Sequence, residues 1–353
     1  MNLDASEAWL LSAYGAASHR AWADQLIASQ KALAWQRLEL PGRHFAWRIR
    51  GNPLSWMDAL PTSTPGLIVA TSMVDLATLK GLHPRLAAVP SLLYFHENQF
   101  AYPESPNQLA SLEPKMVQLY GALAADQVAF NSEYNRSSFL EGVDAMLARF
   151  PDAVPANVTK RIRDRSLVLP VPIDPVQAGK RDPRLILWNH RWEYDKAPEV
   201  FTQAMVNLAA TGIDFRLALL GDRGRVAHPA LVELRRAMPD RIVADGRIEV
   251  QPYRSVLARS SIVVSTARHE FQGLSVLEAA SAGARPLVPD ALCYPEYLPA
   301  AYRYPAEDVY ALTQSIQQWL EGALPPPVDV GRYASAILTP RWREALQSML
   351  VDS

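Results

Sequence analysis

The sequence predicts an α/β fold built from two doubly wound parallel sheets. Short apolar runs alternate with stretches of helical spacing along the whole chain, and this alternation is typical of parallel sheets whose strands are joined by helices. With 353 residues, the chain is long enough for two domains of ordinary size. We therefore expect two facing domains with a ligand held in the cleft between them.

The apolar runs mark the predicted strands in order. They occupy residues 8–15, 66–71, 91–97, 127–132 and 166–172 in the first half, and 185–191, 215–221, 248–252, 261–267 and 285–290 in the second. The polar, proline-rich segment 171–184 is the best linker, and a second proline cluster lies at 324–331. We predict one domain at 1–178 and another at 179–330, followed by a C-terminal helix in 331–353 that could cross back to the first domain.

The composition is that of a soluble globular protein. Hydrophobic residues make up 49% of the chain and charged residues 20%, and the net charge is −1. No apolar run reaches the roughly 18 residues of a membrane span, and the start has no cationic leader. The single cysteine, Cys293, excludes an intrachain disulfide and suits a reducing compartment, so we expect a cytoplasmic protein without membrane contact.

Arginine dominates the basic residues. It supplies 29 of the 35, and many of them cluster at 160–165 and 216–259. Arginine suits bidentate phosphate contacts, so these clusters indicate a local phosphate-binding face. Biased codon usage is the alternative explanation.

Residues 269–283 place two glutamates on either side of a glycine. The preceding run, 261–267, is apolar and β-branched, which is typical of a buried strand. Glu270 therefore lies at the carboxyl end of a strand, where open α/β sheets bind ligands. Gly273 opens the next helix, whose free N–H groups and dipole attract an anion. Glu278 lies one turn inside that helix, and the alternative interpretation is an acid that the helix start favours.

Residues 188–196 place two cations at the end of another predicted strand, with Arg191 five residues before Lys196. Arginine can bind one diphosphate bidentately there, and lysine can add a point charge. The alternative is a solvated loop with an internal ion pair, either Arg191–Glu193 or Asp195–Lys196.

These spacings resemble those of a known enzyme class. Arg-x4-Lys after the first strand of a domain, followed by Glu-x7-Glu across a strand–helix turn, is similar to the retaining GT-B glycosyltransferases of family 4, which have two Rossmann-like domains. The resemblance implies that the cations neutralise the donor diphosphate, that Glu270 touches the transferred sugar and is catalytic, and that Glu278 holds the ribose hydroxyls. One difference is Gln272, which stands where the usual motif has an aromatic residue, while Phe271 is one position early. The implied donor-binding residues are Gly15, Arg191, Lys196, Glu270, Gly273, Leu274, Ser275 and Glu278.

Six further segments narrow the resemblance. They are residues 14–22, 40–56, 93–103, 128–139, 190–196 and 293–299. In this order they resemble the tRNA-queuosine α-mannosyltransferase family, which transfers mannose from GDP-mannose to the queuosine base of a tRNA. The resemblance implies that the first domain binds the acceptor and the second binds the sugar nucleotide. The first turn differs, because many relatives have two adjacent glycines where this chain has Gly15 followed by Ala16 and Ala17.

The acceptor surface is implied by the same resemblance. His96 follows a predicted strand and would be catalytic through contact with sugar or acceptor; a satisfied structural histidine is the alternative. Residues 45–52 interleave Phe45 and Trp47 with two arginines, which suits stacking on a base beside phosphate contacts. A packed β-hairpin with snorkelling arginines explains that stretch equally well, and a helix N-cap at 131 or 132 is an alternative for the asparagines. The implied acceptor-binding residues are Trp47, Arg48, Arg50, Glu97, Asn98, Asn131 and Asn135.

The chemistry expected from this resemblance uses no metal and no cofactor beyond the sugar nucleotide, which we expect to be GDP-mannose. No Asp-x-Asp occurs in the chain, and two cations with a helix start could carry the leaving diphosphate. The resemblance implies retention through a same-face, oxocarbenium-like path. Rival interpretations are a transferase with another sugar nucleotide and a lipid, glycan or small-molecule acceptor, a nucleotide-sugar epimerase, and a non-catalytic relative.

Overall fold

The chain divides into two compact units. The structure is a computed structural model that describes residues 6–102, 111–150, 152–223 and 228–351. One unit comprises Met1–Pro172 with Leu338–Ser353, and the other comprises Ile173–Ile337. Pro103, which ends the segment 93–103, and residues 224–227 of the arginine-rich stretch lie outside the described residues. None of the helices in the described part of the chain is long and apolar enough to span a membrane.

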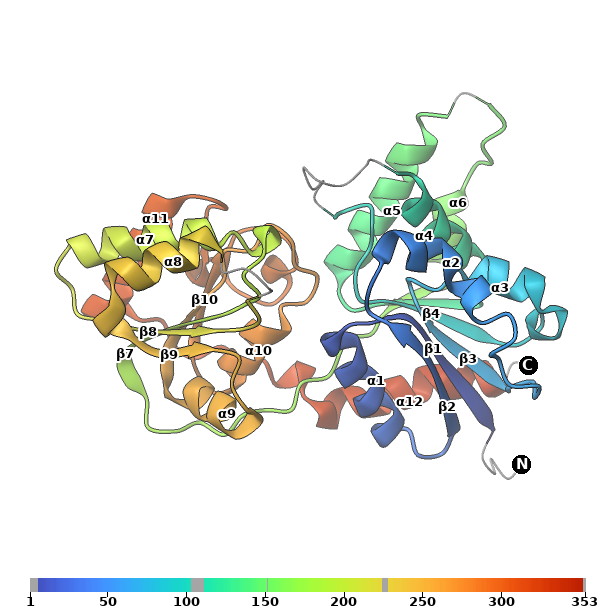
Figure 1. Ribbon diagram of the computed structural model, residues 1–353, viewed down its shortest axis with the longest axis horizontal. Helices are drawn as coiled ribbons and strands as arrows, with labels where there is room; N and C mark the ends of the chain where they lie inside the picture. The colour runs from blue at the N-terminus through green and yellow to red at the C-terminus, as the bar shows by residue number, and fades with distance from the viewer. Residues whose placement is uncertain (1–5, 103–110, 151, 224–227, 352–353) are drawn as a thin grey trace. The chain divides into compact units, whose positions relative to one another are not determined.

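The first unit is built on a six-stranded parallel sheet with the order β2-β1-β3-β4-β5-β6 (Figure 1). Its strands are β1 (Glu7–Gly15), β2 (Ala34–Pro41), β3 (Leu67–Thr71), β4 (Ser91–Phe95), β5 (Gln127–Phe130) and β6 (Ser166–Val168). Its helices are α1 (Ala17–Ser29), α2 (Phe45–Ser55), α3 (Leu76–Leu82), α4 (Glu113–Ala124), α5 (Glu133–Leu147), α6 (Val158–Arg163) and most of α12 (Ser335–Val351). Because β1 pairs with both β2 and β3, the direction of winding reverses there, and the carboxyl ends of β1 and β3 form a switch point where such sheets bind ligands.

Alternating side chains cover the two faces of this sheet. On one face, Leu11, Ala70 and Leu93 belong to the core that also takes residues from helices α2 to α6. On the other face, Tyr94 stacks on Trp22 of α1 with 4.8 Å between ring centroids, and its ring centroid lies 4.9 Å from that of Trp342 of α12. The sheet is therefore covered by α2 to α6 on one side and by α1 and α12 on the other.

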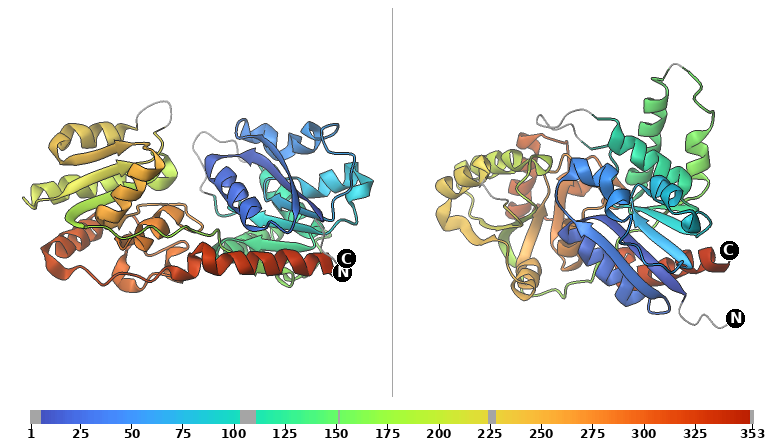
Figure 2. Two further views of the ribbon diagram at one scale, coloured as in Figure 1. Left: turned by 90° about the horizontal axis from the view of Figure 1, so that it is seen from below. Right: turned by 45° about the vertical axis from the view of Figure 1, so that its right-hand side comes forward.

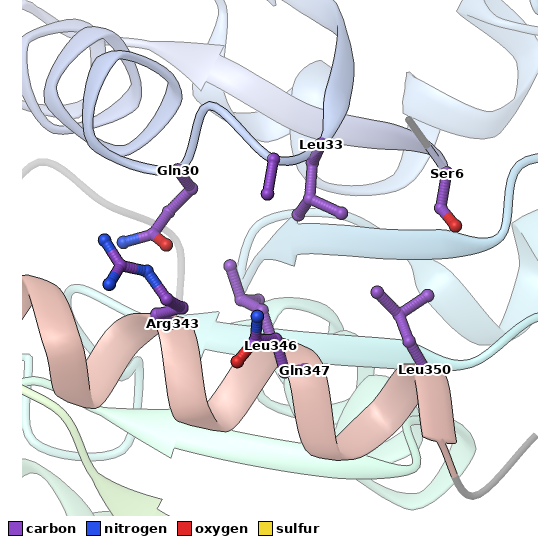
Figure 3. Close-up of a pocket in the computed structure, with 8 residues that line it drawn as sticks. Ser6, Gln30, Leu33, Arg343, Leu346, Gln347 and Leu350 are labelled. Carbon is purple, nitrogen blue, oxygen red and sulfur yellow. The ribbon is translucent and has the colours of Figure 1, made fainter. Parts of the chain in front are cut away.

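Helix α12 runs along this second face (Figure 2). Its Trp342 donates from Nε1 to the carbonyl of Pro170 over 3.1 Å, and Gln30 donates to the carbonyl of Thr339 over 3.1 Å. A small, mainly apolar pocket remains between α12 and the turn that joins α1 to β2 (Figure 3). It is lined by Ser6, Gln30, Ala32, Leu33, Arg343, Leu346, Gln347 and Leu350.

The second unit contains another six-stranded parallel sheet, with the order β12-β11-β10-β7-β8-β9. Its strands are β7 (Asp182–Asn189), β8 (Arg216–Leu220), β9 (Ile242–Gly246), β10 (Ser260–Val264), β11 (Arg285–Pro289) and β12 (Arg303–Tyr304). Its helices are α7 (Pro198–Ala210), α8 (Pro229–Ala237), α9 (Val250–Arg259), α10 (Leu274–Ser281) and α11 (Val309–Gln318). Helices α7, α8 and α11 lie on one face and α9 and α10 on the other (Figure 1). The winding reverses between β7 and β10, so their carboxyl ends form the switch point of this sheet.

The two parallel sheets confirm the predicted fold class, but several local predictions were wrong. Strands β2, β9 and β12 were not predicted; all three lie at sheet edges, and the half-exposed β2 and β9 carry too few apolar residues to stand out. The strand predicted at 248–252 does not form, because Val250, which is 64% exposed, begins helix α9. Residues 45–55 form helix α2, so the β-hairpin alternative for this stretch is also wrong.

Candidate active site

The loops that follow β7 and β10 meet at the switch point of the second sheet. These strands are direct neighbours, with Ile186 paired to Ile262. The loop after β7 carries Arg191 and Lys196, and the loop after β10 carries Glu270. Carboxyl ends of neighbouring parallel strands lie at the same edge, so the side chains that the sequence singled out converge there.

Lys196 is the buried centre of this edge. Its side chain is 10% exposed, and its ammonium donates to the carbonyl of His269 over 2.7 Å and to Oε2 of Glu270 over 3.2 Å. It also lies 3.4 Å from Oδ2 of Asp195, so the ion pair foreseen as an alternative does form. Burial by itself would lower the pKa of Lys196, but the two carboxylates outweigh it and raise the pKa. Lys196 therefore stays positively charged.

Glu270 is held in its ionised form by this contact. Its side chain is 20% exposed. Burial would raise the pKa of the carboxyl, but the nearby ammonium of Lys196 overrides that effect and lowers the pKa to about 2. Two histidines of the same cluster, His190 and His269, have pKa values lowered to about 4 by burial and then by Lys196. At neutral pH the cluster therefore combines charged carboxylates and an ammonium with neutral imidazoles.

Arg191 lies at the exposed margin of the cluster. Its side chain is 54% exposed, its Nη1 lies 2.9 Å from Oε2 of Glu193, and its Nη2 lies 3.9 Å from Oδ2 of Asp195. The internal ion pairs given as the alternative interpretation are thus present. Both cations lie near the carboxylate of Asp195, which they share. Contact of the two cations with a diphosphate stays a prediction.

The start of α10 requires a glycine. Gly273 has φ of +75°, and a Cβ there would lie 2.7 Å from the hydroxyl oxygen of Tyr297 and 3.0 Å from the ring of Tyr294. No side chain caps α10, so Leu274 and Ser275 enter the first turn with backbone N–H groups that no capping side chain occupies. This geometry suits the anion site expected at the helix start, and anion binding there stays a prediction.

The two residues before Gly273, where this chain differs from the family motif, are both buried. Phe271 is 4% exposed, and its ring packs edge-on against His269 with 4.6 Å between ring centroids. Gln272 is 3% exposed, and its carbonyl accepts a hydrogen bond from Tyr297 over 3.2 Å. The departure from the motif is therefore accommodated by burial of both residues.

Glu278 lies on the second turn of α10 and is tied to two residues that the sequence did not single out. Tyr253 of α9 donates from its hydroxyl to Oε2 of Glu278 over 2.7 Å, and Asn189, at the end of β7, donates to the hydroxyl oxygen of Tyr253 over 3.2 Å. Burial raises the pKa of Glu278, and the hydrogen bond from Tyr253 works against that rise. Tyr253 was missed because the segment before it was predicted as a strand; helical spacing from Val250 would have placed it correctly.

In the first unit, Gly15 ends β1 beside the carboxylate of Glu39. A Cβ at Gly15 would lie 2.6 Å from the carboxyl carbon of Glu39, so the side chain of Glu39 would have to shift to make room for one. His96 follows β4, and its ring stacks on His19 with 4.4 Å between centroids. Burial, followed by the neighbouring His19, lowers the pKa of His96 well below its usual range. In this structure His96 is therefore a neutral, packed ring, and its catalytic role stays a prediction.

The three predicted asparagines hold one another. Asn98 donates to Oδ1 of Asn135 over 2.9 Å, and Asn135 donates to Oδ1 of Asn131 over 2.8 Å. Asn131 in turn donates to the carbonyl of His96 over 2.8 Å. The cap foreseen at 131 or 132 forms at Ser132, whose hydroxyl accepts from the backbone of Asn135. These buried amides hold the loop that carries His96, and their contact with an acceptor stays a prediction.

The remaining predicted acceptor residues lie on α2 and in the loop after β4. Trp47 is 53% exposed, and its indole lies against Gly51, where a Cβ would come within 2.4 Å of the ring. Arg50 pairs with the buried Asp75 over 2.6 Å, whereas Arg48 donates to the hydroxyl of Ser55 over 3.2 Å. Glu97 is half-buried. Among the described residues, its carboxylate makes no hydrogen bond to helix α2.

Comparison with known proteins identifies the family of this chain. Residues 7–173 match the model of the tRNA-queuosine alpha-mannosyltransferase N-terminal family, and residues 183–322 match that of the glycosyl transferases group 1. The tRNA-queuosine alpha-mannosyltransferase of Drosophila melanogaster is 31% identical over 296 residues, which cover 80% of this chain and 77% of that protein.

Solved structures with little sequence identity share the fold. A lipopolysaccharide outer core galactosyltransferase in its apo form has a TM-score of 0.67 at 12% identity, with 97% of this chain and 99% of that chain covered. A sucrose-phosphate synthase of Thermosynechococcus elongatus has a TM-score of 0.67 at 14% identity, with 98% and 96% covered. The fold is GT-B, and the protein is a glycosyltransferase. Its sequence relationship is more specific than its fold: the chain belongs to the tRNA-queuosine alpha-mannosyltransferase family.

Proposed function

We propose that this glycosyltransferase transfers mannose from GDP-mannose to the queuosine nucleoside of a tRNA, with retention of the anomeric configuration. The observation that carries the proposal is the paired Lys196 and Glu270 at the switch point of the second sheet, in a chain that belongs to this family. The name of the Drosophila relative supplies both the transferred sugar and the acceptor.

The proposed donor site uses each charged group differently. Arg191, exposed at the margin, meets the diphosphate, and the first turn of α10 adds backbone N–H groups without a side-chain cap. Lys196 contributes a fixed positive charge, because two carboxylates keep it protonated. These groups neutralise the leaving diphosphate, so we propose that the reaction needs no metal ion and no further cofactor.

The proposed reaction breaks the bond between the anomeric carbon and the diphosphate oxygen, and the bonding electrons stay on that oxygen. The acceptor hydroxyl adds to the same face of the sugar, and its proton passes to the leaving phosphate oxygen, which gives GDP and the glycosylated nucleoside. Glu270 remains ionised well below neutral pH and faces the positive charge that develops on the sugar.

Trp47 is the residue that best supports an RNA acceptor. One face of its indole rests on Gly51 and half of its surface is exposed, which is the arrangement of a stacking platform for a base. Arg48 and Arg50 follow Trp47 on the same helix, and we propose that they contact the phosphate backbone. The buried, unpaired Cys293 suits a cytoplasmic location, where tRNA is available.

Mass spectrometry of tRNA nucleosides tests the proposal. The protein is incubated with tRNA that contains queuosine and, in separate reactions, with GDP-mannose, other GDP-sugars and UDP-sugars. We expect a mass increase of one hexose on queuosine with GDP-mannose and none on tRNA that lacks queuosine, and with the Glu270→Gln variant the increase should form about 10²-fold more slowly. A hexose transferred from another donor, or onto a lipid, glycan or small molecule instead, would identify the alternative enzyme. Donor consumption without transfer would identify an epimerase.

A further inference from the structure

A chain of hydrogen bonds ends on the carboxylate of Glu278. It starts at the side-chain amide of Asn189, passes over 3.2 Å to the hydroxyl of Tyr253, and reaches Oε2 of Glu278 over 2.7 Å. Each member comes from a different element, namely the end of β7, helix α9 and helix α10. The chain therefore joins three elements at the switch point of the second sheet.

The direction of these hydrogen bonds is fixed by a neighbouring carbonyl. The nitrogen Nδ2 of Asn189 also donates to the backbone carbonyl of Ser275 over 3.0 Å. A carbonyl oxygen can only accept, so the amide nitrogen, and not the amide oxygen, faces both Ser275 and Tyr253. The hydroxyl oxygen of Tyr253 accepts from Asn189, and its single proton is left for Glu278. Tyr253 is thus a dedicated donor to the carboxylate.

This arrangement leaves one side of the carboxylate for a ligand. Oε2 of Glu278 is occupied by Tyr253, while Oε1 accepts no hydrogen bond from any residue that the structure describes. The groups around Glu278 are Tyr253 and Arg254 of α9, Asn189 of β7 and the carboxylate of Asp174. Burial raises the pKa of Glu278, and the hydrogen bond from Tyr253 is the largest influence that lowers it. Without Tyr253, the carboxylate would be less firmly oriented and more readily protonated.

We propose that Tyr253 is a positioning residue for the donor nucleotide: it holds Glu278 ionised and turned so that Oε1 accepts a hydrogen bond from a ribose hydroxyl. The enzyme would then select ribonucleotides over deoxyribonucleotides through Tyr253, although Tyr253 itself does not touch the ribose. This inference rests on the proposed function, because it takes Glu278 as the ribose-binding residue of the donor site.

Calorimetric titration with GDP and with 2′-deoxy-GDP tests the proposal on four proteins. They are the wild type, Tyr253→Phe, Glu278→Gln and Tyr310→Phe, the last a control at a tyrosine of the same unit that is 68% exposed. We expect the wild type to bind GDP at least tenfold more tightly than 2′-deoxy-GDP. Tyr253→Phe should lose roughly tenfold in GDP affinity but much less in 2′-deoxy-GDP affinity, as expected when a hydrogen bond that orients a charged group is removed.

The pH dependence of GDP binding separates positioning from a structural role. Binding should weaken on the acid side as Glu278 takes up a proton, and in Tyr253→Phe this decline should move to higher pH, because the influence that lowers the pKa is gone. Glu278→Gln should lack the decline, and Tyr310→Phe should match the wild type.

Two results would overturn the inference alone. One is a Tyr253→Phe variant that keeps the wild-type preference for ribose and the wild-type pH profile. The other is an equal loss for both nucleotides accompanied by a lower melting temperature, which would make Tyr253 merely structural. If Glu278→Gln binds GDP as tightly as the wild type, or if the wild type binds neither nucleotide, the proposed donor site itself fails and the inference fails with it.

Discussion

Replacing Lys196 by methionine should destabilise the second unit, because the ammonium is the buried counter-charge of two carboxylates. Asp195 has a side chain that is 2% exposed, and Glu270 one that is 20% exposed. Methionine preserves most of the volume and the chain length but removes the charge. The carboxylates would then face each other, largely buried, without a cation.

The structure gives the size of this effect in two ways. Removing one partner from a buried ion pair costs roughly 3–5 kcal/mol. The pKa of Glu270 falls from an ordinary 4.5 to about 2, and each pKa unit corresponds to about 1.4 kcal/mol, which gives about 3 kcal/mol for this carboxylate. The two figures agree, and a loss of about 3 kcal/mol should lower the melting temperature of a unit of this size by roughly 6–12 °C.

The sign of the pH dependence makes the test sharper. In the wild type, the depressed pKa of Glu270 contributes stability that is present above pH 4.5 and is lost as the pH falls toward 2. In Lys196→Met, burial should instead raise the pKa of Glu270, so protonation relieves the unpaired charge at mild acidity. The difference in melting temperature between the two proteins should therefore be largest near pH 7.5 and shrink below about pH 5.

Thermal unfolding followed by circular dichroism from pH 4 to 8 measures this effect, and Arg191→Ala is the matched control. Arg191 is 54% exposed, so its removal should cost at most about 1 kcal/mol of stability. GDP affinity should nevertheless fall by roughly 10- to 100-fold, because a charge-assisted phosphate contact is lost. If Lys196→Met melts within about a degree of the wild type at pH 7.5, or if its loss of stability does not vary with pH, the reasoning about the buried cluster is refuted.

Three further predictions concern Glu270, Gly51 and the two buried histidines of the cluster. Glu270→Gln should lower kcat by about 10²-fold, equivalent to roughly 3 kcal/mol of transition-state stabilisation, while GDP affinity measured by calorimetry stays close to the wild type; full turnover in a folded variant would exclude the catalytic role. Gly51→Ala should push the indole of Trp47 off α2 and weaken tRNA binding several-fold in filter-binding assays with GDP affinity unchanged, and normal tRNA affinity would count against stacking on Trp47. The pKa values of His190 and His269 lie at about 4 instead of 6.5, so urea unfolding should show the free energy of unfolding decreasing as the pH falls from 6.5 to 4; His190→Asn should flatten that decline, and an unchanged slope would contradict a neutral buried His190.

The sequence by itself determined the fold class and the elements that form the donor edge. Buried parallel strands such as Leu67–Thr71 are almost entirely apolar, because both of their faces are covered by helices, and continuous apolar runs are easy to find. The residue types and their positions after predicted strands then identified the candidate site residues Arg191, Lys196, Glu270 and Glu278. They could be assigned to one site because the loops that follow parallel strands lie at one edge of a sheet. The edge strands were not predicted, because a strand such as β2 is half exposed and mixes apolar with polar residues instead of forming a continuous apolar run.

Only the tertiary structure decided what each of these charges does. Arg191 and Lys196 look alike in the sequence, yet one is half exposed and the other is buried between Asp195 and Glu270. The burial of a charged side chain and its ion-pair partners depend on residues that are far apart in the chain, such as Lys196 and Glu270. No local sequence pattern encodes the distance between two such residues. Asn98 and the other predicted acceptor asparagines turned inward for the same reason, because a buried amide must find hydrogen-bond partners, and the nearest ones were each other. The role of Tyr253 could not be predicted from the sequence, because it depends on a 2.7 Å hydrogen bond to Glu278, which is 25 residues away on another helix.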